Sequence, residues 1–201
     1  MAFFGKKNTS SAKQDIRIDM MEDKDIPAVV EIDNASFEYS WSAEAFAPFV
    51  HEQRLIAKVV WMGEKIVGYY CYEKQQGALR LMNMAVHPDY RKKKIGTLMM
   101  QDIMKTLDTL KSGSARKDKL IFECDEYNLG FQLFVRSLCK DPESPDTKPT
   151  DPVLLQHPLP LRGYYEDSGH DAIGFEITTK ELWGQQDHAP AHLTRWKGRE
   201  P

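Results

Sequence analysis

The chain has little cysteine and no long apolar run among its 201 residues. Its cysteines, Cys71, Cys124 and Cys139, are odd in number and far apart, which matches neither a disulfide framework nor a zinc knuckle. No stretch approaches the roughly 18 consecutive apolar residues of a membrane helix. The apolar run at residues 2–4 is too short for the core of a signal peptide. We therefore expect a cytoplasmic protein with reduced thiols and no membrane as partner.

An excess of positive charge is also missing, since 27 Lys and Arg stand against 30 Asp and Glu. Dedicated nucleic-acid binders carry a strongly basic balance, so the composition disfavours nucleic acid as a partner. The six histidines show no ligand spacing such as His-Glu-x-x-His, and no metal site is predicted. Hydrophobic residues make up 41% of the chain, which is enough for a buried core.

The order of apolar patterns predicts a mixed α/β sheet in one domain. Alternating and β-branched runs predict strands at residues 16–20, 55–62, 66–72, 78–86, 120–125 and 172–178. Apolar residues at helical spacing predict four helices, which begin at Asp25 and at Ser42 and extend over 96–110 and 129–138. We find no internal repeat.

Composition also predicts the limits of the domain. Residues 1–14 are polar and predict a flexible arm, residues 15–180 form the domain, and residues 181–201 are expected to be a loose tail. The segment 140–160 holds six of the eleven prolines. Because proline breaks helices and is excluded from central strands, we expect an inserted loop there. The oligomeric state stays open between a monomer and a homodimer, because an exposed strand edge or the tail tryptophans could serve either state.

The most informative stretch is residues 83–97, where a strand, a basic loop and a helix start follow one another. The first N–H groups of a helix lack partners, and the helix dipole adds positive charge there. Four consecutive cations at residues 91–94 precede the helix. Such a site suits a pyrophosphate. On the residues alone, a solvated basic turn without a ligand is an equal alternative.

This stretch resembles the acetyl-CoA motif of the GNAT superfamily of N-acetyltransferases, Arg/Gln-x-x-Gly-x-Gly/Ala. It reads Arg91-x-x-Lys94-x-Gly96, with Lys94 in place of the first glycine. Further stretches resemble RimI-like N-terminal acetyltransferases in the same order along the chain, at residues 123–129, 134–138 and 162–172. The resemblance implies a single-domain GNAT fold, an α/β fold whose mixed, splayed sheet is flanked by helices.

The resemblance also implies that acetyl-CoA is the co-substrate and lies where the sheet splays. It assigns the pantetheine arm to the backbone of Met84, Ala85 and Val86. It assigns the phosphates to the loop and the helix start, which comprise Arg91, Lys92, Lys93, Lys94, Ile95, Gly96 and Thr97. Asn128 would reach the cofactor with its amide. An asparagine at a strand-to-helix turn is an equally good helix cap, and it can serve both purposes.

For catalysis, the resemblance implies direct attack of an amine on the thioester after a base has removed the ammonium proton. Glu123 matches the position of the base in RimI-like enzymes, and partial burial would raise its pKa towards the useful range. Those enzymes carry a tyrosine seven residues after the asparagine as general acid. Val135 stands there and has no proton to donate. Tyr164, Tyr165 or water could replace it, and we take Tyr164 as the candidate.

The acceptor site is predicted from aromatic residues at two places in the chain. Tyr164 and Tyr165 resemble the tyrosines that hold the first residues of a peptide, and Glu38 and Trp41 would face them across a groove. An α-amine has a pKa of about 7.7–8.0 against about 10.4 for lysine, so an N-terminus is easier to deprotonate. Polyamines, amino sugars and lysine stay open as acceptors.

A second function stays open beside N-acetyl transfer. A catalytically weak GNAT domain could bind CoA, or a partner, as a sensor or interaction module. Lys94 in the phosphate motif and Val135 in place of the acid favour this alternative.

Overall fold

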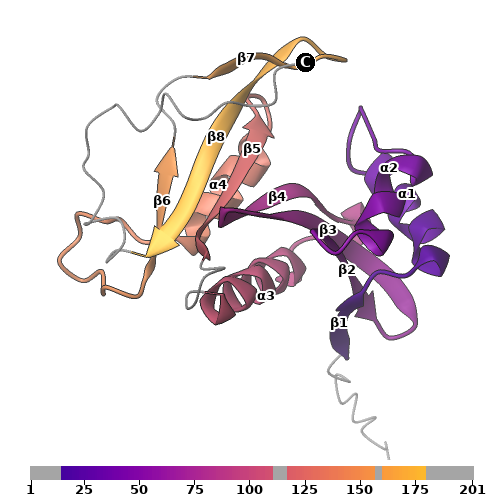
Figure 1. Ribbon diagram of the computed structural model, residues 1–201, viewed down its shortest axis with the longest axis horizontal. Coiled ribbons are helices and arrows are strands. Elements are labelled where there is room, and N and C mark those ends of the chain that lie inside the picture. Colours follow the sequence, from indigo (N-terminus) through magenta and orange to yellow (C-terminus); the bar gives the residue numbers. More distant parts are fainter. Residues whose placement is uncertain (1–14, 111–116, 157–159, 180–201) are drawn as a thin grey trace, which may run out of the picture.

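The computed structural model describes residues 15–110, 117–156 and 160–179 (Figure 1). Its helices are α1 (Ile26–Asn34), α2 (Ala43–His51), α3 (Ile95–Thr109) and α4 (Leu129–Leu138), with short 3-10 turns at Asp23–Asp25 and Pro88–Tyr90. Its strands are β1 (Ile16–Met20), β2 (Leu55–Met62), β3 (Lys65–Gln75), β4 (Gly77–Val86), β5 (Lys117–Asp125), β6 (Pro152–Gln156), β7 (Leu161–Tyr165) and β8 (His170–Thr179). The predicted arm at 1–14 and tail at 181–201 lie outside the described residues.

The strands form one mixed sheet in the order β1-β2-β3-β4-β5-β8-β6, and β7 also pairs with β8. The β4–β5 pair is parallel, whereas the other pairs are antiparallel. Helices cover both faces. Tyr69 and Cys71 of β3 pack in the cluster that includes α1 and α2, while Tyr70 and Tyr72 pack in the cluster that includes α3 and α4. This is the alternation expected of a strand buried on both sides, and it confirms the α/β prediction.

A bulge in β4 opens the sheet. Cys71 pairs with Asn83 and Tyr72 with Leu81, so Met82 is an extra residue in β4. A bulge of this kind bends the strand. The pairing of β4 with β5 ends at Leu81 and Phe122, although β4 continues to Val86 and β5 to Asp125. The two halves of the sheet diverge beyond this point (Figure 1), which confirms the splayed sheet.

The proline-rich insertion is not a loop throughout, and that part of the prediction was wrong. Strand β6 pairs with β8 from Pro152–Thr179 to Gln156–Phe175. Pro152 stands at the first position of a strand at the end of the sheet order, where a missing N–H is tolerated. The fully buried Val153 anchors the strand to the core. Strand β7 was not predicted as a strand either.

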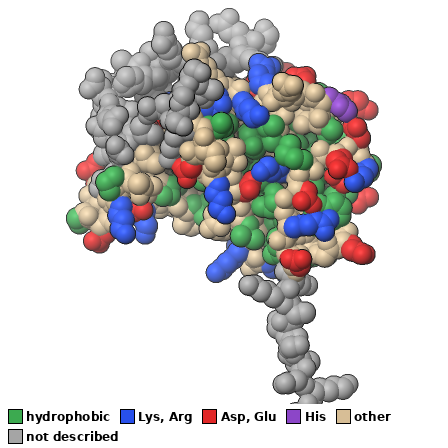
Figure 2. Space-filling view, turned by 60° about the horizontal axis from the view of Figure 1, so that its bottom comes forward, with side chains coloured by type: hydrophobic (Ala, Val, Ile, Leu, Met, Phe, Trp, Pro, Cys, Tyr) green, Lys and Arg blue, Asp and Glu red, His purple; other side chains and the backbone are tan. Residues whose placement is uncertain are grey.

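Two surface properties bear on possible partners. None of the helices in the described ranges is long and apolar enough to cross a membrane. On the face turned to the viewer in Figure 2, lysine and arginine side chains are interspersed with acidic ones and form no single basic field.

Candidate active site

The loop before α3 has a left-handed backbone at two lysines. Lys92 and Lys94 have φ of 62° and 63°, a region that favours glycine. Lys94 is the N-cap of α3, and its carbonyl accepts the first helical hydrogen bond, from Leu98 N at 3.0 Å. The N–H groups of Ile95, Gly96 and Thr97 precede that bond and have no acceptor within the helix. The conformation explains why a glycine suits this position of the motif.

Two of the four cations in this loop contact other parts of the protein. Arg91 donates from Nε to the Val86 carbonyl at 3.0 Å and from Nη2 to Ser36 Oγ at 3.1 Å. The Lys93 ammonium lies 4.8 Å from the centre of the Tyr90 ring. The loop is therefore held in place before any ligand arrives, and it stays exposed to solvent.

Replacing Lys94 by glycine is expected to stabilise the protein. The left-handed conformation costs a non-glycine residue about 1–2 kcal/mol, and the greater freedom of glycine in the unfolded chain costs about 0.5–1 kcal/mol. Lys94→Gly should therefore raise the free energy of unfolding by about 0.5–1 kcal/mol, measured by thermal denaturation. Lys93 lies between the two left-handed residues and is not left-handed itself, so Lys93→Gly should lower stability. A fall in Tm for Lys94→Gly would contradict the strain argument.

Packing, in addition to the motif, explains why residue 96 is a glycine. A Cβ at this position would lie 3.2 Å from Cζ of Phe134, which projects from α4. The absence of a side chain thus lets α3 and α4 approach each other on the side of the sheet where β4 and β5 diverge.

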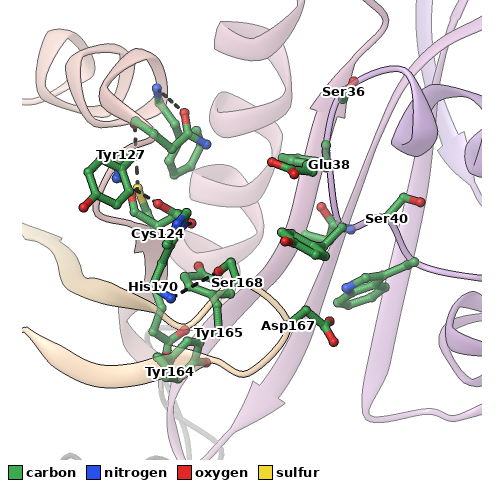
Figure 3. Close-up of a pocket in the computed structure, with 18 of the residues that line it drawn as sticks. Ser36, Glu38, Ser40, Cys124, Tyr127, Tyr164, Tyr165, Asp167, Ser168 and His170 are labelled. Carbon is green, nitrogen blue, oxygen red and sulfur yellow. Dashed lines mark hydrogen bonds and ion pairs between the residues drawn. The ribbon is translucent and has the colours of Figure 1, made fainter.

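A pocket of about 600 Å³ lies in the opening between β4 and β5 (Figure 3). It brings together predicted residues that are distant in the sequence: Glu38, Trp41, Met84, Glu123, Asn128, Tyr164 and Tyr165. The other predicted residues, Ala85, Val86 and 91–97, do not line it and lie towards the start of α3. The backbone of β4 beyond Leu81 pairs with β3 on one side, and no described strand pairs with its other side. An extended pantetheine arm fits an unpaired strand edge of this kind.

Glu123 lies in this pocket, bound to an arginine that the sequence analysis did not identify. Arg80 Nη2 is 2.7 Å from Glu123 Oε1, and Arg80 Nε is 3.3 Å from Oε2. Arg80 also donates to the Tyr164 hydroxyl at 2.9 Å. Only 5% of the Glu123 side chain is exposed. Burial raises the pKa of Glu123, and the nearby Arg80 charge partly opposes that rise.

Removing the charge of Arg80 is expected to shift the acidic limb of the pH–activity profile to higher pH. If Glu123 acts as an ionised base, activity falls as the pH drops through its pKa. Arg80→Gln removes the charge that lowers this pKa, so the acidic limb of kcat/KM should shift to higher pH. Arg80→Lys, which keeps the charge, should shift it less. An unmoved limb in Arg80→Gln would show that Glu123 is not the titrating group.

Asn128 is a helix cap in the structure. Its Oδ1 accepts a hydrogen bond from Phe131 N at 3.1 Å at the start of α4. The cap uses the oxygen and leaves the amide nitrogen as a donor at the pocket wall. The two predicted roles are thus compatible, because they use different atoms of one side chain.

The loop of residues 35–42, between α1 and α2, is anchored by a buried aspartate that the sequence analysis also missed. Asp33 of α1 is fully buried and accepts hydrogen bonds from the Tyr69 hydroxyl, from Asn83 Nδ2 at 3.0 Å and from the Trp41 backbone N–H. The Trp41 ring packs against Phe46 and Phe49 of α2. These contacts fix the loop that carries Glu38 and Trp41 over the pocket.

The comparisons with known proteins agree with this geometry. The sequence model of the acetyltransferase (GNAT) family matches residues 26–130. The chain belongs to the GNAT acetyltransferase family. No curated protein matches its sequence.

Solved structures share the fold of this GNAT domain at low identity. The ribosomal-protein-S18-alanine N-acetyltransferase of Escherichia coli is 19% identical with a TM-score of 0.64, over 82% of this chain and 94% of that one. Ard1 of Thermoplasma volcanium is 15% identical with a TM-score of 0.62, over 81% and 97%. Arabidopsis thaliana NAA60 in complex with acetyl-CoA is 13% identical with a TM-score of 0.61, over 81% and 97%.

The position at which RimI-like enzymes carry a general acid holds no acid in this GNAT domain. Val135 of α4 is fully buried and belongs to the core cluster of α3. Tyr164 lies in the pocket, but burial and the Glu123 charge raise its pKa, so it holds its proton firmly. Within the described residues, no group of three or more His, Cys, Asp and Glu side chains is placed to hold a metal ion.

Proposed function

We propose that the chain transfers the acetyl group of acetyl-CoA to a primary amine, with a protein N-terminal α-amine as the first candidate. The observation that carries this proposal is the pocket between the diverging β4 and β5, with Glu123 inside it. Acetyl-CoA supplies an activated thioester as co-substrate. The backbone of β4 around Met84–Val86, the first N–H groups of α3 and the Asn128 amide would hold it.

In the proposed reaction, Glu123 takes a proton from the acceptor ammonium, directly or through water. The free amine then attacks the thioester carbonyl, so that a C–N bond forms and the C–S bond breaks. Arg80 fixes both Glu123 oxygens and the Tyr164 hydroxyl, so it positions the base. A carboxylate has further lone pairs beside those that Arg80 uses, and these can accept the proton.

The lining of the pocket supports a cationic substrate. Carboxylates line the pocket at Glu38, Glu123, Asp125, Glu166 and Asp167. Tyr164 and Tyr165 pack edge to face, with ring centres 5.1 Å apart, and form one wall. Two structural neighbours, an S18-alanine N-acetyltransferase and NAA60 in complex with a bisubstrate analogue, support this choice as proteins of the same fold.

A panel of acceptors tests the proposal with the full chain. A lysine-free peptide with a free N-terminus, a lysine peptide with a blocked N-terminus and a diamine would each be incubated with acetyl-CoA. We expect the fastest CoA release with the free N-terminus, because its α-amine loses its proton more readily. A faster reaction with the diamine or the lysine peptide would overturn the N-terminal assignment and retain N-acetyl transfer.

The alternative proposal is a CoA-binding sensor or interaction module with little catalysis. The buried Val135 at the position of the family acid favours it. Acetyl-CoA binding without acceptor-dependent CoA release would support this alternative against the enzyme.

A further inference from the structure

A histidine–aspartate pair without an assigned role lines the same pocket. His170, the first residue of β8, has Nδ1 at 2.9 Å from Oδ2 of Asp125, the last residue of β5. Asp125 Oδ1 accepts a hydrogen bond from Tyr127 N at 2.8 Å. The Tyr127 ring lies edge-on to the imidazole, with ring centres 4.8 Å apart. The imidazole is thus oriented through one nitrogen, and none of the described residues forms a hydrogen bond with Nε2.

The pair is held at the wall of the pocket that carries Asn128. Asp125 and Tyr127 are close neighbours of Asn128 in the sequence, and all of them line the pocket with His170 (Figure 3). A backbone hydrogen bond holds the end of β5 against the start of β8, because Glu126 N donates to the Asp171 carbonyl at 3.1 Å. The His170 side chain is 38% exposed, so its ring can exchange protons with solvent.

A general acid would assist the departure of the CoA thiolate. Val135 has no proton to donate, and the raised pKa of Tyr164 makes its phenol a weaker acid than an ordinary tyrosine. In model compounds a thiol has a pKa of about 8.5, a phenol about 10 and an imidazolium about 6.5. Proton transfer to a thiolate is therefore downhill from an imidazolium and uphill from a phenol.

We propose that His170 is the general acid of acetyl transfer and that Asp125 is its positioning residue. This inference rests on the proposed function. As the C–S bond breaks, the electron pair leaves with sulfur as a thiolate. The His170 imidazolium gives its Nε2 proton to that thiolate, which yields CoA with a free thiol and a neutral imidazole bound to Asp125. Solvent then returns a proton to the imidazole. Glu123 passes the first acceptor proton to solvent, and the newly acetylated nitrogen releases its second proton to solvent as the amide forms.

Kinetics of two His170 variants test the inference in the full chain. His170→Asn keeps a group that can bind Asp125 but cannot deliver the proton. We expect kcat for acceptor-dependent CoA release to fall about 100-fold, with the Kd for CoA, measured by calorimetry, within twofold of the wild type. Imidazole added to His170→Ala should restore at least tenfold of the lost rate. A merely structural histidine would not respond to imidazole in this way.

The chain offers a matched control in an exposed histidine–aspartate pair, His51 and Asp23, whose Nε2–Oδ1 distance is 3.0 Å. His51→Asn should retain the wild-type kcat, because His51 does not line the pocket. A kcat for His170→Asn within threefold of the wild type, or a loss in His170→Ala that imidazole does not reverse, would overturn the role of His170 alone. A wild-type protein that releases no CoA with any acceptor would overturn the proposed function, and this inference with it.

Discussion

Glu123→Gln is expected to lower acceptor-dependent acetyl transfer by about 100-fold or more, the usual contribution of a general base. The amide is nearly the same size as the carboxylate, and its oxygen can still accept from Arg80. The pocket should keep its shape while losing its proton acceptor. Steady-state release of CoA with a saturating amine measures the effect. The affinity for acetyl-CoA, measured by calorimetry, should stay within twofold, because the substitution leaves the loop before α3, the proposed site of the phosphates, unchanged.

A second buried glutamate of the sheet provides the control for this variant. Glu176 of β8 is 7% exposed and binds Lys119 at 2.9 Å, but it does not line the pocket. Glu176→Gln removes the charge of a similarly buried carboxylate in an ion pair and should keep the wild-type rate within twofold. Equal losses in the two variants would mean that the Glu123 effect comes from the sheet and not from proton transfer.

Asp33→Ala is expected to destabilise the protein by about 3–5 kcal/mol. It leaves the hydroxyl of Tyr69, the amide of Asn83 and the Trp41 N–H without their acceptor, and each buried unsatisfied group costs about 1–3 kcal/mol. Urea denaturation measures the change in the free energy of unfolding. The same substitution should raise KM for the acceptor, because Trp41 loses the bond that holds its loop over the pocket.

Glu31 offers a control on the same helix, α1. It is exposed, and Glu31→Ala should change the free energy of unfolding by no more than about 0.5 kcal/mol. A loss of less than about 1 kcal/mol for Asp33→Ala would contradict the account, since it would show that water satisfies the three donors.

Local patterns were sufficient to predict most elements of the fold. Strand β2 and helix α3 follow from the spacing of apolar residues, and the observed α3 differs from its prediction by one residue at each end. Strands β6 and β7 were missed although the equally short β1 was predicted, because neither shows the alternation of apolar and charged residues that β1 has. Strand β6 also begins at a proline and is stabilised by a distant partner, β8, which no local pattern reveals.

The site was predicted less completely, because its chemistry depends on contacts between distant residues. The resemblance led to Glu123, but Arg80 lies 43 residues away and carries no motif of its own. Asp33 looks like an ordinary helix residue until the fold places Tyr69 and Asn83 around it. His170 and Asp125 are 45 residues apart and meet only because β5 and β8 pair. The alternation of apolar and polar residues along the strands predicts neither the Arg80–Glu123 pair nor the His170–Asp125 pair.

The most direct test of the central claim is mass spectrometry of an acceptor incubated with acetyl-CoA and the full chain. The account predicts that the acceptor gains one acetyl group on an amine for each CoA released, and that Glu123→Gln slows this gain about 100-fold. If acetyl-CoA binds in calorimetry and every acceptor tested stays unmodified, transfer to an amine is contradicted. The domain would then be better described as a CoA-binding module.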